Sequence, residues 1–203
     1  RGLGRSLVEV IQAEAPEVEF FLASRRIAET NSAATARAQR RPMDFSKPAE
    51  ALQFFEDLKA FNPDRIFYVA GGGPHGPFED KKWADHEWAF EVSFRFPARL
   101  LHFAMNEISS SQVIFIGSAV AESSPDPLAA SYAAAKHALK GLITTVQEEQ
   151  KNRALPQDIR IYSAPYMLTD LLPLNAWPRQ KGLAQDPKTV ARHLWQWSLS
   201  SLV

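Results

Sequence analysis

The sequence predicts an α/β fold, namely a doubly wound parallel sheet in a Rossmann-like three-layer α/β/α arrangement. Two patterns and the length indicate this class. Short apolar segments, too brief for helices, alternate with amphipathic segments of helical spacing. The short segments are continuously apolar, which is typical of parallel strands covered on both faces. A length of 203 residues suits one domain, and we see no linker or repeat, so residues 1–203 are expected to form a single domain.

The elements can be placed in order along the chain. We expect strands at residues 18–23, 41–45, 65–69, 112–117 and 159–163. We expect helices at residues 3–15, 47–61, 82–108, 131–150 and 187–199, with a weakly helical polar stretch at 27–40. The first helix has apolar residues at positions 3, 7, 10 and 11 and is stopped by Pro16. Residues 164–185 are irregular and rich in proline, and we expect them to form a substrate lid.

Composition narrows the classes of partner and compartment. Lys plus Arg and Asp plus Glu both total 23, so no net field favours nucleic acid or an anionic membrane, and neither partner is expected. The absence of cysteine excludes disulfides and thiol nucleophiles and makes a cytoplasmic protein the default. No apolar run approaches the roughly 18 residues of a membrane span. The five histidines show no metal-ligand spacing, so no metal is expected.

Tyr132 and Lys136 are the sharpest chemical pair. They are separated by three alanines, and at this spacing both side chains lie on one face of the predicted helix. An ammonium group beside a phenol lowers the pKa of the phenol, which suits a general acid near neutral pH. Alone, the pair is better explained as a tyrosine and a lysine on a solvated helix face.

Ser118 adds context, because it follows the strand at 112–117 and precedes Tyr132 by 14 residues. A strand, a serine, a short loop and a Tyr-x-x-x-Lys helix resemble the short-chain dehydrogenase/reductase family over the whole chain. The resemblance implies that Tyr132 donates a proton to a substrate carbonyl as hydride arrives from a nicotinamide. It implies further that Lys136 holds the nicotinamide ribose and that Ser118 hydrogen-bonds the carbonyl.

The opening of the chain supports this resemblance. Arg1, Gly2, Leu3 and Gly4 are similar to the second half of the family's Thr-Gly-x-x-x-Gly-x-Gly loop, whose backbone holds the cofactor pyrophosphate at a helix N-terminus. The resemblance then implies that the family's central first strand lies upstream of residue 1. We expect roughly ten or more further residues there in the native polypeptide.

The choice of cofactor follows from the end of the second strand of the family. That position is occupied by Ser24, Arg25 and Arg26, with no carboxylate to bind the ribose 2′-hydroxyl of NAD. Two guanidinium groups suit a 2′-phosphate, and Arg1 is a further basic candidate. NADP(H) is therefore the expected cofactor; the alternative is that one or both arginines face solvent.

Further motifs match the family in part. Asp44 and Phe45 resemble its Asp-hydrophobic pair at the adenine, although Asp44 is also a plausible turn residue. Ala70 and Gly71 match the end of its Asn-Asn-Ala-Gly loop, with Tyr68 and Val69 in place of the asparagines, and Gly72 after them is also expected to approach the cofactor. Two matches are altered: Pro165 and Thr169 resemble its cofactor-binding Pro-Gly and Thr, without the glycine, and Ser93 replaces the helix asparagine of its proton relay.

The function that these residues imply is an NADPH-dependent oxidoreductase acting on a small-molecule ketone or aldehyde, or on the corresponding alcohol. An alternative is a family-like NADP(H)-binding sensor or scaffold with little turnover, motivated by Ser93 and the altered Pro165 loop. The resemblance also implies a homodimer or homotetramer. Nothing in the sequence identifies the substrate.

Overall fold

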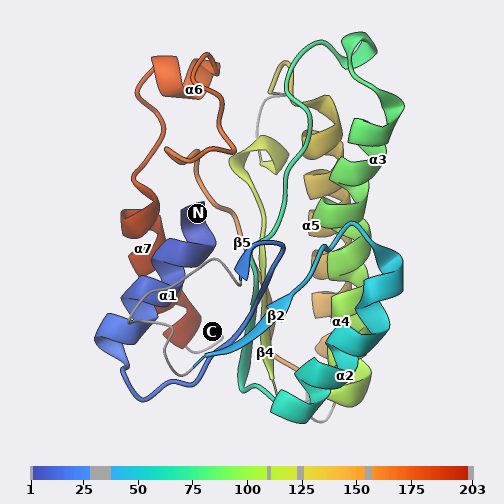
Figure 1. The fold of residues 1–203 in the computed structure, drawn as a ribbon, viewed down its shortest axis with the longest axis vertical. Coiled ribbons are helices and arrows are strands. Elements are labelled where there is room, and N and C mark those ends of the chain that lie inside the picture. The colour runs from blue at the N-terminus through green and yellow to red at the C-terminus, as the bar shows by residue number, and fades with distance from the viewer. Residues whose placement is uncertain (1, 28–37, 109–110, 123–125, 154–156, 201–203) are drawn as a thin grey trace.

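A computed structural model describes residues 2–27, 38–108, 111–122, 126–153 and 157–200 of the chain. Helices cover both faces of parallel strands in three layers, which confirms the predicted fold class (Figure 1). The strands are β1 (Phe21–Ser24), β2 (Gln39–Pro42), β3 (Arg65–Tyr68), β4 (Gln112–Ile116) and β5 (Ile159–Tyr162). Among the described residues every strand pairing is parallel, so the carboxyl ends of paired strands share one edge.

The helices divide between the two faces. One face carries α1 (Gly2–Glu14) and α7 (Pro187–Leu199), which pack against each other (Figure 1). The other carries α2 (Ala51–Phe61), α3 (Trp83–Phe90), α4 (Phe96–Glu107) and α5 (Ala130–Gln150). Shorter elements are α6 (Trp177–Gln180), the 3-10 helices Pro48–Glu50, Phe78–Asp80 and Ala119–Ala121, and a π-helical turn at Glu91–Arg95. Within the described ranges no helix is both long and apolar enough to span a membrane.

The strands form two hydrogen-bonded groups rather than one sheet. β1 pairs with β2, and β3, β4 and β5 pair in that order. β1 and β3 nevertheless border the same apolar core, to which Phe21 of β1 and Ile66 of β3 both contribute. The two groups therefore share a core without being hydrogen-bonded to each other.

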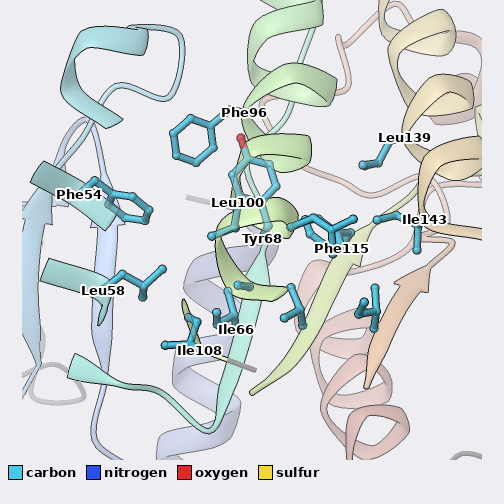
Figure 2. Packing of buried hydrophobic residues seen from close by; sticks show 14 of the residues in the cluster. Phe54, Leu58, Ile66, Tyr68, Phe96, Leu100, Ile108, Phe115, Leu139 and Ile143 are labelled. Carbon is cyan, nitrogen blue, oxygen red and sulfur yellow. The ribbon is translucent and has the colours of Figure 1, made fainter. Parts of the chain in front are cut away.

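The strand β4 lies between the two cores. Val113 and Phe115 face the core under α2, α4 and α5, part of which Figure 2 shows, whereas Ile114 and Ile116 face the core under α1 and α7. From Val113 to Ile116 the strand is apolar because successive side chains alternate between two buried faces. All five of its residues are buried.

The π-helical turn ends beside a proline. Pro97, near the start of α4, has no N–H, so the carbonyl of Val92 five residues earlier cannot receive a helical hydrogen bond from it. The hydroxyl of Tyr68 donates to this carbonyl instead, at 2.7 Å. Tyr68 thus joins the end of β3 to the helix in the middle of the core (Figure 2).

Several predicted boundaries were wrong. β1 begins at Phe21, three residues later than expected, although the carbonyl of Phe20 just before it accepts from Gln39 N–H of β2 at 2.8 Å. β2 covers Gln39–Pro42 rather than 41–45, so Gln39 and Arg40 are strand residues and not helical. Most of the polar stretch assigned to 27–40 lies outside the described residues. The helix expected at 82–108 is interrupted by the π-helical turn.

Candidate active site

Three predicted residues meet at the carboxyl end of β4. Ser118 follows β4 and caps the 3-10 helix Ala119–Ala121 by accepting a hydrogen bond from the Val120 N–H at 3.4 Å. Tyr132 lies in the first turn of α5, and its hydroxyl is hydrogen-bonded to the Ser118 side chain. Lys136 lies one turn later, with Nζ 5.6 Å from the centroid of the Tyr132 ring.

Lys136 is a buried cation that makes one hydrogen bond within the described part of the chain. Its residue surface is 2% exposed, and Nζ donates to the backbone carbonyl of Ile116 at 2.7 Å. In the described part of the chain it forms no ion pair with a carboxylate. Burial therefore lowers the pKa of Lys136 to about 8.

The acidity of Tyr132 differs from the sequence expectation. We expected Lys136 to lower its pKa, but burial raises the pKa of Tyr132 above its usual value, and only the hydrogen bond with Ser118 acts in the opposite direction. The spacing of four residues places the two groups on one helix face, yet it contains no information about burial. The phenol consequently holds its proton at neutral pH.

The loop after β3 passes directly beside this cluster. A Cβ added at Gly71 would lie 3.2 Å from Lys136 Nζ and 3.5 Å from Ser93 Oγ, so the backbone of the loop passes close to both side chains. Ser93 is fully buried in the π-helical turn, and its hydroxyl accepts from Gly72 N–H at 3.1 Å and donates to Gly72 C=O at 3.0 Å. The Ser93 proton is thus directed to the loop and not to Lys136.

A second group of predicted residues lies at the carboxyl ends of β1 and β2. Asp44 accepts hydrogen bonds from the backbone and the side chain of Ser46, at 3.0 and 2.7 Å. Burial opposes its ionisation, but these bonds and the charge of Arg25 together lower the pKa of Asp44. Arg25 is exposed, and its guanidinium lies 5.9 Å from the centroid of the Trp88 ring.

Trp88 connects the two groups. Its indole lies against Gly72, where an added Cβ would be only 2.6 Å from the Trp88 ring. The guanidinium of Arg25 lies over the same indole ring. The position of Trp88 between the two groups depends on tertiary contacts that helical spacing does not reveal.

The opening of the chain lies at the same edge. Gly2 begins α1 with φ +64°, a left-handed conformation that favours glycine, and faces the side chain of Thr169, 3.4 Å from where its Cβ would be. Gly4 faces Val69 at the end of β3. The first turn of α1 contains no acidic residue. Arg1 lies outside the described residues.

Other predicted side chains are not assembled with the cluster. Leu3 is buried in the core under α1 and α7, and Phe45 packs against Tyr68 and Phe96 in the other core. Ser24 ends β1 with its carbonyl accepting from Met43 N–H, and Ala70 packs against the core. Pro165 is half-buried, and Arg26 is exposed. Leu3 is thus closed off by the core, whereas Phe45 and Ala70 are only half-buried.

The segment 164–185 is tied to the loop before Tyr132. Trp177 Nε1 donates to Asp126 Oδ1 at 2.7 Å, and the Tyr166 hydroxyl donates to Asp126 Oδ2 at 3.2 Å. Burial and the charges of Asp126 and Tyr132 raise the pKa of Tyr166 to about 12. Leu171 of the same segment reaches Gly72. Sequence reasoning did not identify Asp126 or Tyr166.

His86 is a further residue that sequence reasoning missed. It is buried in α3 and hydrogen-bonded to Ser131, the residue before Tyr132. A signal was present, because His86, Ala89 and Ser93 follow the i, i+3, i+7 pattern of one helix face, and all three are buried. Among the described residues, no group of three or more His, Asp or Glu side chains is arranged to hold a metal ion.

Solved structures share this fold over nearly the whole chain. A dehydrogenase/reductase from Sinorhizobium meliloti 1021 is 22% identical, with a TM-score of 0.80 over 98% of this chain and 84% of that one. A short chain dehydrogenase from Burkholderia cenocepacia J2315 in complex with NADP is 20% identical, with a TM-score of 0.81 over 98% and 86%. An alcohol dehydrogenase from the archaeon Thermococcus sibiricus, complexed with 5-hydroxy-NADP, is 18% identical, with a TM-score of 0.79 over 100% and 88%.

The family follows from a sequence comparison. No curated protein matches this chain significantly. The family model described as short chain dehydrogenase, however, matches residues 1–172, which is most of the chain. The chain therefore belongs to the short-chain dehydrogenase family.

Proposed function

We propose that this protein is an NADPH-dependent oxidoreductase that reduces the carbonyl group of a small ketone or aldehyde, or oxidises the corresponding alcohol. The observation that carries the proposal is the cluster of Ser118, Tyr132 and Lys136 beyond β4. The phenol is hydrogen-bonded to the serine, and the ammonium lies 5.6 Å from its ring. Membership of a dehydrogenase family supports the same reaction class.

The residues present fit a dinucleotide at this edge. The left-handed Gly2 at the start of α1 and the absence of acidic residues in the first turn suit an anionic pyrophosphate. Gly71 leaves room beside Lys136, which would hold the nicotinamide ribose. Arg25, at the end of β1, would hold the 2′-phosphate, and Asp44 would meet the adenine. Bound NADPH would supply the hydride.

Tyr132, Ser118 and Lys136 would carry out and support the transfer of the proton to the substrate. Tyr132 keeps its proton at neutral pH because burial raises its pKa, so it enters the reaction as an acid. It would give this proton to the carbonyl oxygen, to which the Ser118 hydroxyl would also donate a hydrogen bond. The resulting phenolate would be stabilised by the nearby ammonium of Lys136, whose pKa of about 8 leaves it mostly protonated at neutral pH.

The preference for NADPH is supported by Arg25 and by relatives. The described end of β1 offers arginines and no carboxylate. Related structures from Burkholderia cenocepacia and from a metagenomic source are described as complexes with NADP. A guanidinium can bind a phosphate in bidentate fashion, which an acidic residue would repel.

The first test is a titration of tryptophan fluorescence with NADPH and, in parallel, NADH. We expect tight NADPH binding, much weaker NADH binding, and a loss of about tenfold in NADPH affinity in Arg25→Ala with little change for NADH. Consumption of NADPH with 4-nitrobenzaldehyde then tests reduction. Equal affinity for both cofactors would overturn the assignment of Arg25, and binding of neither would overturn the oxidoreductase proposal.

A second function, an NADP(H)-binding sensor or scaffold, is favoured by one observation. Ser93 replaces the family asparagine, and its hydroxyl is fully engaged with Gly72. Tight NADPH binding without reduction across a panel of ketones and aldehydes would favour this function.

We propose further that residues 164–185 form a lid over the substrate. The two bonds from Tyr166 and Trp177 to Asp126 hold this segment beside the loop before Tyr132. Asp126→Ala removes both acceptors, so we expect KM to rise several-fold with little change in NADPH affinity. An unchanged KM would contradict the lid.

We also propose that a strand ahead of residue 1 lies between β1 and β3. Both strands border one core, yet each is hydrogen-bonded to a different partner, β2 or β4. A longer native polypeptide should slow amide exchange in β1 and β3, and unchanged exchange would contradict the proposal. Assembly into a dimer or tetramer stays a proposal, which light scattering would test.

A further inference from the structure

His86 is almost fully enclosed, although imidazole is a polar group. Its residue surface is 5% exposed, and both ring nitrogens have partners. Nδ1 lies 2.5 Å from Ser131 Oγ, and Nε2 lies 3.2 Å from the backbone carbonyl oxygen of Phe78. The rings of Phe78 and Trp83 pack beside it, with centroids at 4.4 and 5.8 Å.

The partners determine where the protons lie in the neutral ring. A backbone carbonyl only accepts, so Nε2 carries the proton and donates to Phe78. Nδ1 is then an acceptor, and the Ser131 hydroxyl donates to it. His86 therefore joins three segments by two directed hydrogen bonds: the loop after β3, the helix α3 and the first turn of α5.

The first turn of α5 depends on such outside support. Ala129, at the N-cap, offers no side-chain acceptor to the free N–H groups of the turn. Leu128, just before it, has φ +70°, and its carbonyl accepts from Gly76 N–H at 2.8 Å. Ser131, which is 4% exposed, precedes Tyr132 directly. Movement of Ser131 would therefore carry the phenol of Tyr132 with it.

We propose that His86 is a positioning residue, which fixes the Tyr132 phenol against Ser118 by holding Ser131 through Nδ1. This inference rests on the proposed oxidoreductase function. The competing explanation is that His86 only stabilises the fold. The two explanations differ in which hydrogen bond of His86 matters for turnover. A positioning role needs the bond to Ser131, because the bond to Phe78 does not act on α5 directly.

Two amide variants separate the hydrogen bonds. In His86→Asn the side-chain oxygen can occupy the position of Nδ1 and still accept from Ser131, whereas in His86→Gln the longer amide can occupy the position of Nε2 and still donate to Phe78. His86→Phe keeps the ring and loses both bonds. His193→Asn is the matched control, because His193 Nδ1 lies 2.7 Å from the Tyr162 hydroxyl on the other face of the sheet, away from the cluster.

The first readout is NADPH-dependent reduction of 4-nitrobenzaldehyde. We expect kcat to fall about tenfold in His86→Gln and His86→Phe, with KM nearly unchanged, and to stay within about threefold of wild type in His86→Asn and His193→Asn. Ser131→Ala should match His86→Gln, and the double variant should be no worse than either single one. Equal losses in the Asn and Gln variants, or additive losses in the double variant, would overturn the proposal.

The second readout does not depend on activity. Amide hydrogen exchange in residues 126–135 should accelerate in His86→Gln and remain near wild type in His86→Asn. Unchanged exchange in His86→Gln would overturn the positioning role even in an active enzyme. A wild-type protein that binds no NADPH and reduces no carbonyl would instead overturn the proposed function. The exchange measurement would still show whether His86 holds the first turn of α5.

Discussion

Each end of the β3–β4–β5 sheet has one buried cation, and the two cations differ in their hydrogen-bond partners. At the amino end, Arg160 is 5% exposed, and its Nε and Nη2 donate to the Asp158 carboxylate at 2.7 and 2.8 Å. Further bonds run to the carbonyls of Trp197 and Ser200 at the end of α7. At the carboxyl end, Lys136 is 2% exposed and is bonded to a single carbonyl.

This difference separates a structural charge from a reactive one. A buried cation with a bidentate carboxylate and several carbonyls has its desolvation largely offset, so its charge is held in place. A buried ammonium without a carboxylate keeps an unbalanced charge that a developing anion can use. We therefore expect changes at the amino end to lower stability and changes at the carboxyl end to lower turnover.

The largest expected effect is on Tyr132, the group that would use the charge of Lys136. Tyr132→Phe removes the proton donor, and we expect kcat to fall by about 10²- to 10⁴-fold, the usual contribution of a general acid. NADPH affinity, measured by tryptophan fluorescence, should change little. Tyr162→Phe, which loses a hydroxyl on the other face, should keep its kcat. Turnover that survives Tyr132→Phe would mean that another group supplies the proton.

The next effect is on Arg160. Arg160→Met leaves Asp158 without its bidentate partner, and because the Asp158 side chain is 28% exposed we expect the free energy of unfolding to fall by about 2 kcal/mol. Urea titration measures this loss, while kcat of the folded enzyme should stay the same. Lys151→Met, which removes an exposed pair with Glu148, is the control and should leave the urea midpoint unchanged. A loss of kcat in Arg160→Met would weaken the separation between the two ends.

The smallest effect concerns the pH dependence of stability. The pKa of Lys136 is about 8 in the folded chain, below the ordinary 10.5, so between these values the unfolded chain binds the extra proton. Stability from this group therefore increases as pH rises through that window, by about 1–2 kcal/mol between pH 7.5 and 9.5. Urea titrations at both pH values should show this increase in wild type and not in Lys136→Met. Equal pH dependence in the two proteins would mean that Lys136 is not deprotonated in this window.

The sequence was sufficient where spacing within one element determines geometry. The alternation of apolar and amphipathic segments predicted the layers, and the interval between Tyr132 and Lys136 placed both on one helix face. Ser118 was predicted because the loop that it begins leads into the same helix. The structure brings these three together, and their roles stay a prediction until turnover is measured.

Other features depend on contacts between distant segments and could not be predicted in this way. The raised pKa of Tyr132 reflects burial, which a spacing of four does not encode. Trp88 and His86 come from a helix that looked like ordinary packing, and their partners are 16 and 45 residues away in the chain, Gly72 and Ser131. Strand ends were misplaced because pairing between strands, and not local apolarity, decides where a strand begins.

The π-helical turn at Glu91–Arg95 also sets the angular phase between α3 and α4. A π-turn contains one residue more than an α-turn, and each residue rotates a helix by about 100°. Deleting one residue from this turn would remove the extra residue and turn α3 by about that angle about its axis relative to α4. His86 and Trp88 would then leave Ser131 and Gly72, so a single-residue deletion far from any loop would dismantle one wall of the site.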